Sequence, residues 1–341
     1  MKRLTLAFLY NVRHQYPDPD RPETQVETDF DDPETIEAMT AHLLGCGFDV
    51  IPIEADPDAY ATLYAQRRDI DLVFNYAMGL YGRARYAQVP AMLEMLQLPY
   101  TGSDPLTQAL ILDKARMQQV LSACNVPVLC SQVFETGDEP LQRGLTFPLI
   151  VKPVAQGSSA GITADSVVRD EAALYRQAGR VIATFGEPAL VQPFLEGREF
   201  SIPMMGNPPD IFPIIEPDFS RLPQEYARID SLEVKWIFEE QTESHHLLCP
   251  APVEPALKDR LGKTVLAAWK ALGIRDWCRI DLRCDSLGNP YIIDVNSPPG
   301  MIPPERSMTS YFPMSARAAG IDYQGLLTKL IQTAMDRWTR Q

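Results

Sequence analysis

The chain has 341 residues, a formal net charge of −14 and six cysteines. This length is enough for two or three domains with substantial cores, and no apolar run approaches the ~20 residues needed to span a bilayer. The acidic balance argues against general electrostatic binding of nucleic acid, although a phosphate pocket needs only a few local cations. The scattered cysteines form no CxxC pair and no zinc spacing, so we expect reduced thiols in a cytoplasmic protein.

The first third of the chain alternates apolar, strand-like runs with helical segments. Strands are predicted at 4–10, 48–54 and 70–76, and helices at 33–45, 57–67 and 90–98. Asp32 is predicted to cap the first helix, with Pro33 at its first position. Such alternation predicts a parallel α/β sheet whose ligand side lies at the carboxyl ends of the strands, from Asn11 and Asn75 onward. We interpret the short apolar start as the first strand and not as a signal peptide, because no small-residue cleavage site follows.

The remainder of the chain begins with a helix predicted at 105–123 and ends with one predicted at 323–339. Between them, strands alternate with turns and helices, without an internal repeat or a flexible linker. A long polar segment, residues 216–247, separates two structured parts. It contains His245 and His246, which we expect to be solvated loop residues, with substrate contact as the alternative.

The motif VKPVAQGSSAG, residues 151–161, predicts a phosphate site. An apolar strand delivers Lys152, and a turn containing Gly157 and Ser158 follows. Small residues let backbone N–H groups approach an anion closely, and such turns form anion-binding nests. Lys152 would add a compact positive charge for the phosphates. An ordinary surface turn is the alternative when this motif is taken alone.

A second motif, ALVQPFLEGREF at residues 189–200, runs from an apolar strand into a loop. The backbone groups that become free at the loop could read the edge of an adenine. Glu199 could bind the ribose hydroxyls through its two carboxylate oxygens. Taken alone, the segment would more often be structural.

The most informative stretch is CRIDLRCDSLGNPYIIDVNSPPG, residues 278–300. Two apolar runs flank a cluster of turn residues, which is typical of a β-hairpin. Asp281 and Asp294 could face each other across it, and Asn296 lies two residues beyond Asp294 on the same side of the strand. Two carboxylates and an amide oxygen suit Mg²⁺, whose shell substrate phosphates would complete. A hairpin with a solvated polar face is the alternative.

The order of the motifs resembles the D-alanine–D-alanine ligase branch of the ATP-grasp superfamily. The resemblance covers most of residues 70–335 and is carried by LPYTGSD, LDKARMQQVL, VKPVAQGSSAG, VQPFLEGREF, WCRIDLRCD and IIDVNSPPGM. It implies an α/β (α+β) fold of three domains, with ATP held between two antiparallel sheets. The implied limits are 1–103 for an N-terminal parallel-sheet domain, 104–195 for a central ATP-grasp subdomain and 196–341 for a C-terminal catalytic subdomain.

The resemblance also implies a role for each matching residue. ATP would be bound by Lys114, Lys152, Gly157, Ser158, Gln192, Pro193, Phe194, Leu195 and Glu199. One or two Mg²⁺ ions, or Mn²⁺ in their place, would be bound by Asp281, Asp294 and Asn296. The catalytic residues would be Arg279, Ser158, Gly300 and the lid cation Lys235.

Such residues can activate a carboxylate. Phosphorylation by ATP gives an acylphosphate with a good leaving group, and an amine then attacks through a tetrahedral oxyanion. Mg²⁺ would neutralise charge during phosphoryl transfer, while Arg279 and the Gly300 backbone are placed to stabilise the oxyanion. Part of residues 216–247 would close over the site and exclude water. A mobile surface loop is the alternative for that segment.

The chain departs from the family mainly where substrates bind. The loop 11–32 lacks the family's glutamate that grips the ammonium of the first D-alanine, and Glu27, Asp29 and Asp31 are the carboxylates nearby. Trp236 occupies the position of a family tyrosine, and an indole has no hydroxyl to relay a proton.

Three smaller departures also concern the site. Asp294 stands where the family has a magnesium-binding glutamate, one methylene longer. The family's serine after the glycine loop has no clear match, and Ser307 would require a small insertion. Arg83 and Arg85 could hold a substrate carboxylate by bidentate contacts, or could be solvated at a helix start.

We therefore expect a carboxylate–amine ligase whose small-molecule amino acid or carboxylic acid substrates are not two D-alanines. The alternatives are a true D-alanine–D-alanine ligase with a divergent substrate site and a non-catalytic, nucleotide-binding regulatory protein. Neither nucleic acid nor a membrane is an expected partner. A homodimer is implied by the resemblance alone.

Overall fold

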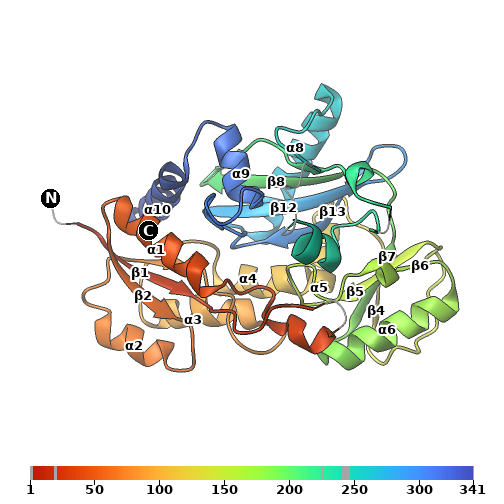
Figure 1. The fold of residues 1–341 in the computed structure, drawn as a ribbon, viewed down its shortest axis with the longest axis horizontal. Helices are drawn as coiled ribbons and strands as arrows, with labels where there is room; N and C mark the ends of the chain where they lie inside the picture. Colours follow the sequence, from red (N-terminus) through yellow and green to blue (C-terminus); the bar gives the residue numbers. More distant parts are fainter. Residues whose placement is uncertain (1–2, 19–20, 225, 240–245, 341) are drawn as a thin grey trace.

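The computed structural model describes residues 3–18, 21–224, 226–239 and 246–340 (Figure 1). Its first unit is a parallel sheet with strand order β2-β1-β3. The strands are β1 (Thr5–Tyr10), β2 (Asp49–Glu54) and β3 (Leu72–Asn75), and the helices are α1 (Pro33–Gly45), α2 (Ala59–Gln66) and α3 (Gln88–Met95). The side chain of Asp32 accepts a hydrogen bond from the Thr35 N–H at 2.7 Å, so the predicted cap of α1 is confirmed.

The prediction of a single helix at 105–123 is wrong, because the helix is interrupted at Asp113. The two helices are α4 (Pro105–Leu112) and α5 (Lys114–Ala123). Asp113 has an extended ψ of 93°, and its side chain accepts from the Arg116 N–H at 3.0 Å, which makes it the cap of α5. The freed Lys114 N–H donates to the Val154 carbonyl at 3.0 Å, and this contact ties the start of α5 to the glycine–serine turn.

Two four-stranded antiparallel sheets follow, with orders β4-β7-β5-β6 and β13-β12-β8-β9. The first contains β4 (Gln132–Phe134), β5 (Leu149–Pro153), β6 (Val167–Val168) and β7 (Ala189–Pro193). The second contains β8 (Glu199–Gly206), β9 (Pro209–Ile211), β12 (Trp277–Cys284) and β13 (Pro290–Asn296). Apolar faces of α6 (Glu171–Phe185) and α8 (Pro255–Leu272) pack on the first and second of these sheets respectively.

Shorter elements connect these units. They are β10 (Glu216–Pro217), β11 (Leu247–Leu248), the 3-10 helices η1 (Pro22–Glu27), η2 (Arg85–Ala87), η3 (Ala164–Ser166) and η4 (Phe219–Arg221), and the π-helix η5 (Val234–Phe238).

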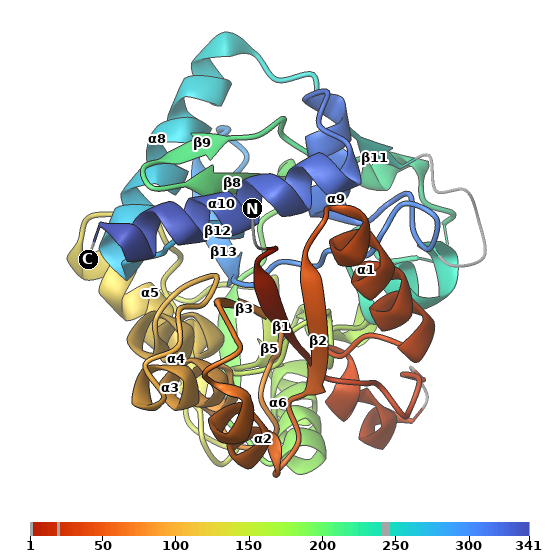
Figure 2. The same ribbon diagram turned by 90° about the vertical axis from the view of Figure 1, so that its left-hand side faces the viewer.

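The chain ends with α9 (Tyr311–Ala318) and α10 (Tyr323–Thr339), which confirms the predicted last helix. Figure 2 shows α10 crossing between the N-terminal sheet and the sheet of β8 and β9. Leu326 and Leu330 of α10 share one buried cluster with Leu6 and Phe8 of β1 and with Met205 of β8. The C-terminus is therefore packed between the first and the last unit.

Each of the three larger sheets lies inside one of the segments 1–103, 104–195 and 196–341, and those limits themselves remain predictions. None of the helices in the described residues is long and apolar enough to cross a membrane.

Candidate active site

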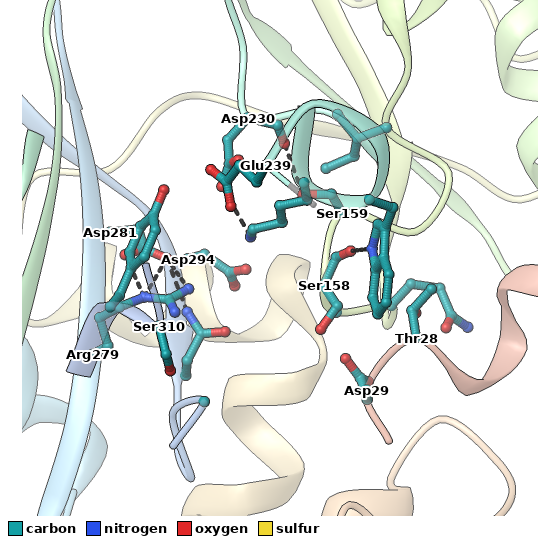
Figure 3. A pocket seen from close by; sticks show the side chains of 18 of the residues that line it. Thr28, Asp29, Ser158, Ser159, Asp230, Glu239, Arg279, Asp281, Asp294 and Ser310 are labelled. Carbon is teal, nitrogen blue, oxygen red and sulfur yellow. Dashed lines mark hydrogen bonds and ion pairs between the residues drawn. The ribbon is translucent and has the colours of Figure 1, made fainter. Parts of the chain in front are cut away.

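One cavity of about 850 Å³ lies between the two antiparallel sheets, the N-terminal loop and residues 229–239 (Figure 3). All the residues predicted to act in catalysis, nucleotide binding or metal binding line it. They are Lys114, Lys152, Gly157, Ser158, Gln192, Pro193, Phe194, Leu195, Glu199, Lys235, Arg279, Asp281, Asp294, Asn296 and Gly300. Their roles remain predictions at this point, but their convergence is a property of the fold.

The predicted hairpin is confirmed, with Asp281 directly opposite Asp294 and Arg279 opposite Asn296. A register shift follows Asp281, and such irregularities often re-aim side chains beside active sites. Asn296 Nδ2 donates to Asp281 Oδ2 at 2.9 Å, and Asp294, opposite Asp281, lines the same cavity.

The chemistry of this group fits Mg²⁺. The described residues contain no cluster of three or more His, Cys, Asp or Glu side chains that could hold a metal ion by themselves. Mg²⁺ commonly takes only one or two protein carboxylates and fills its remaining positions with water and substrate phosphates. Asp281, Asp294 and the amide oxygen of Asn296 meet that requirement without a histidine or a thiolate.

Asp281 is buried and bound on several sides. Burial is the largest single effect and opposes its ionisation, but the Arg279 guanidinium at 2.8 Å, together with Ser201 and Lys235, holds the pKa of this carboxyl below its usual value. Ser201 of β8 adds a hydrogen bond from Oγ at 2.6 Å. The carboxylate is therefore ionised and fixed in direction at neutral pH.

Two lysines supply the positive charge opposite the hairpin. Lys114 Nζ donates to the Gln156 carbonyl at 2.6 Å and lies 3.5 Å from Asp294. Lys152 Nζ donates to the Ile293 carbonyl at 3.2 Å. Burial lowers the pKa of Lys152 to about 8, against the opposing effect of Asp294. A buried ammonium of this kind gains most from an incoming anion.

The glycine–serine turn contains two successive residues with positive φ. Ser158 and Ser159 have φ of 48° and 62°, values that L residues seldom adopt. A Cβ at Gly157 would lie 2.2 Å from Asp29 Oδ1, so a larger residue there would have to displace the Asp29 carboxylate from Arg85 and Tyr86.

The predicted adenine segment, Gln192 to Leu195, leaves the end of β7 along the cavity wall. Gln192 is buried and donates from Nε2 to Gln118 Oε1 at 2.6 Å. Glu199 pairs with Arg283 at 3.0 Å, yet burial raises the pKa of Glu199 to about 7.

Residues 229–239, which we call the lid, cover the other side of the cavity. Lys235 pairs with Asp230 at 2.9 Å. The lid is fixed to the glycine–serine turn by Ser159 Oγ, which donates to the Asp230 carbonyl at 2.7 Å, and by Trp236 Nε1, which donates to the Ser158 carbonyl at 3.2 Å (Figure 3). Residues 240–245 of the segment predicted to close over the site lie outside the described residues.

The three candidate carboxylates of the N-terminal loop have different surroundings. Glu27 accepts backbone N–H groups of the loop itself and does not line the cavity. Asp29 is neutralised by Arg85 at 2.8 Å and also accepts from Tyr86 at 2.8 Å. Asp31 lines the cavity and accepts a hydrogen bond from Tyr76, and among the described residues no cation lies within ion-pair distance of it. Burial raises the pKa of Asp31 to about 6, although Arg13 opposes that effect.

The comparisons with known proteins agree on one family. A model described as the D-ala D-ala ligase C-terminus matches residues 123–332, more than half of the chain. The uncharacterized protein y4sG of Sinorhizobium fredii is 30% identical over 330 residues, which are 95% of this chain and 92% of that protein. The D-alanine–D-alanine ligase of Desulforudis audaxviator is 31% identical over 308 residues, or 88% of this chain and 92% of that one.

The chain belongs to the D-alanine–D-alanine ligase family. A solved D-alanine–D-alanine ligase from Bacillus anthracis, complexed with ATP, has the same fold, with a TM-score of 0.72, 24% identity and 99% coverage of both chains. The predicted family, the ATP-grasp fold class and the enzyme class of a C–N bond-forming ligase are confirmed.

Two predictions about polar side chains in this family member need correction. His246 is not solvated: it is 1% exposed and lies 3.2 Å from Glu239, while His245 falls outside the described residues. Arg83 and Arg85 do not line the cavity. Arg83 is exposed and pairs with Asp113, as the alternative of a solvated arginine expects, whereas Arg85 is buried and pairs with Asp29. Their partners come from distant parts of the chain, so the sequence offered no sign of these pairs.

Sequence reasoning missed several residues of the ligase site. Ser201 and Arg283 each lie two positions from a predicted site residue, Glu199 and Asp281, so strand alternation could have found them. Tyr311 is buried at the start of α9, with the Arg279 guanidinium 5.1 Å from its ring centroid. No local pattern marks it, because the contact joins two separate elements.

Proposed function

We propose that this member of the family is an ATP- and Mg²⁺-dependent ligase that joins a small carboxylic acid to an amine through an acylphosphate. The observation that carries the proposal is the cavity itself. It brings two lysines, the glycine–serine turn and a carboxylate–amide group from separate elements to one place. Such a site acts by positioning and charge, which is what phosphoryl transfer to a carboxylate requires.

The nucleotide would lie between the two antiparallel sheets. Lys114 and Lys152 would bind its phosphates, with the backbone N–H groups around Gly157 and Ser158. Gln192, Pro193, Phe194 and Leu195 would contact the base, and Glu199 the ribose. Asp281, Asp294 and Asn296 would hold Mg²⁺, which when bound neutralises phosphate charge during the transfer.

The second half of the reaction would use Arg279 and Gly300. The carboxylate oxygen of the acid bonds to the γ-phosphorus, and the bond from that phosphorus to the bridging oxygen of ADP breaks. The amine nitrogen then bonds to the acyl carbon, and phosphate leaves. Arg279 and the Gly300 N–H would stabilise the oxyanion formed in between, while Lys235 on the lid would keep the site positively charged.

Asp31 is the carboxylate that we assign to a substrate ammonium in place of the family's glutamate. Asp29 already has a cation partner and Glu27 does not line the cavity, which leaves Asp31. We call the part of the cavity near Asp31 the acid end. The loop lacks the family's glutamate, and Trp236 stands where the family has a tyrosine, which supports at least one substrate other than D-alanine.

A true D-alanine–D-alanine ligase is the second candidate. Relatives with that name from Desulforudis audaxviator and Haemophilus influenzae are 31% and 30% identical to this chain. Identity at this level is compatible with a changed substrate pair, because a few side chains decide which amino acid fits.

The test is Mg²⁺-dependent ADP release with amino acids of both configurations, offered singly and in pairs, with mass analysis of the products. A product equal in mass to both substrates minus water would establish the ligase and name its substrates. D-alanine alone giving the dipeptide would favour the second candidate. ATP binding without ADP release for any pair would contradict both.

A further inference from the structure

Arg13 joins the N-terminal loop to the lid. Its guanidinium carbon lies 4.6 Å from the ring centroid of Tyr16 and 4.6 Å from that of Trp236. Arg13 is only 7% exposed, and all three side chains line the acid end of the cavity. A guanidinium gains more from an aromatic ring when water is excluded, so this contact is strongest while the lid is closed.

The N-terminal side of this contact is fixed. The Arg13 N–H donates to the Asp31 carbonyl at 2.8 Å, and Nη1 donates to the Phe30 carbonyl at 3.0 Å. Asp32, the cap of α1, lies 3.5 Å from Nη2. The backbone and the guanidinium of Arg13 together are therefore anchored to Phe30, Asp31 and Asp32, which all line the cavity.

The lid side is fixed as well. Trp236 Nε1 donates to the Ser158 carbonyl, and the Leu232 N–H donates to the Ile162 carbonyl at 2.8 Å. Through Trp236, Arg13 thus connects the N-terminal loop, the lid and the glycine–serine turn around one end of the cavity. The indole and the guanidinium are both planar, so together they can cover an opening that two flexible side chains would leave permeable.

We propose that Arg13 is a positioning residue that holds Trp236 over the acid end and keeps water away from the acylphosphate. The inference rests on the proposed function. In the productive step the amine nitrogen bonds to the acyl carbon, the C–O bond to phosphate breaks, and the amine loses a proton to solvent. When water enters instead, its oxygen bonds to the acyl carbon and the same C–O bond breaks. ATP is then consumed, and the free acid returns without an amide.

The test is the amount of amide formed per ADP released, with the substrate pair found in the pairwise screen, beginning with D-alanine. Arg13→Met keeps a long unbranched side chain but removes the guanidinium. We expect acid-dependent ADP release in the absence of amine to rise about tenfold, the factor that corresponds to a lost, partly desolvated cation–π contact. Amide per ADP should fall well below the wild-type ratio.

Four further variants separate positioning from a general loss of stability. Arg67→Met removes an arginine–tyrosine contact outside the cavity and should leave the ratio unchanged. Trp236→Leu should lower the ratio like Arg13→Met, and the double variant should lower it no further if the two residues act through each other. Trp236→Phe keeps an aromatic ring for Arg13, so amide per ADP should stay near the wild-type ratio.

An unchanged ratio in folded Arg13→Met, as judged by thermal unfolding, would overturn the inference while leaving the ligase intact. Additive losses in the double variant would also overturn it, because Arg13 would then act independently of Trp236. A wild-type protein that releases no ADP with any pair would overturn the proposed function and, with it, this inference.

Discussion

Asp281 and Asp294 lie opposite each other in the hairpin, but Asp281 has more hydrogen-bond partners than Asp294. Asp281 already accepts from Ser201, Arg279 and Asn296. Asp294 is 26% exposed, lies 3.5 Å from Lys114 and otherwise accepts the N–H of its neighbour in the chain. Asp294 therefore has the freer oxygens for a cation, while Asp281 is better suited to fix the direction of the group.

Asp294→Asn should therefore abolish most turnover. The amide keeps the shape but removes the charge that Mg²⁺ needs, and we expect kcat for ADP release to fall about 100-fold or more. Asp285→Asn, in the exposed turn of the same hairpin, is the control and should leave kcat unchanged. Full activity of the Asp294 variant would contradict the metal assignment.

Protonation of Asp31 should lower the activity of the enzyme at acidic pH. Its pKa is raised to about 6, so the folded protein binds this proton more tightly than the unfolded chain does. The stability contributed by this group is thus fully present below the unfolded pKa near 3.8 and is lost as pH rises through about 6. Binding of an ammonium follows the opposite sign, because only the ionised carboxylate attracts it.

We therefore expect kcat/KM for an acid substrate that carries an ammonium to fall as pH drops below about 6. In Asp31→Asn this limb should be absent, and kcat/KM should be low at every pH. The measurement is a pH profile of kcat/KM for both proteins under saturating ATP. The same limb in the variant would show that another group titrates.

Among the elements, the break between α4 and α5 depends on both a local signal, the cap residue Asp113, and a tertiary contact. The apolar spacing of 105–123 continues across the break, and this continuity predicts one helix. Asp113 is a good cap, but aspartate also occurs inside helices, so its presence alone was not decisive. The contact of the Lys114 N–H with Val154 comes from a strand that lies far along the chain.

Asp113→Ala should lower both stability and nucleotide affinity. Loss of the cap should cost about 1 kcal/mol of unfolding free energy, and KM for ATP should rise because Lys114 begins the helix that Asp113 caps. Asp170→Ala, which removes the equivalent cap of α6 away from the cavity, should cost about as much stability without changing KM. Equal KM values for ATP in the two variants would contradict the connection between the Asp113 cap and nucleotide binding by Lys114.

For the whole molecule, Asp276 is a point where the first and the last unit meet. It is 0% exposed and accepts from the Gly102 N–H at 2.7 Å, from Asn207 Nδ2 at 2.7 Å and from Arg337 of α10 at 2.8 and 2.9 Å. These partners come from the end of the first unit, from the turn between β8 and β9, and from the last helix. The buried carboxylate thus helps to fix the units that form the walls of the cavity.

Asp276→Ala should destabilise the fold by about 3–5 kcal/mol, because it leaves the Arg337 guanidinium buried without its charge partner. Chemical denaturation followed by tryptophan fluorescence measures this loss. The double variant Asp276→Ala/Arg337→Met should recover part of it, since the uncompensated charge is then removed as well. A double variant less stable than the single one would show that the charge was not the cause.

The sequence by itself determined the fold class, most strands and helices, the hairpin register of Asp281 and Asp294, and the predicted site residues that converge on the cavity. These features follow from local periodicity, turn chemistry and the order of motifs, all of which are written along the chain. Only the tertiary structure decided the helix break at Asp113, the burial of His246 and the partners of Asp29 and Arg85. It also decided the contact of Arg13 with Trp236. Each of these depends on a side chain or backbone group from a distant segment, and burial of a polar group selects its partner only after the segments have packed together.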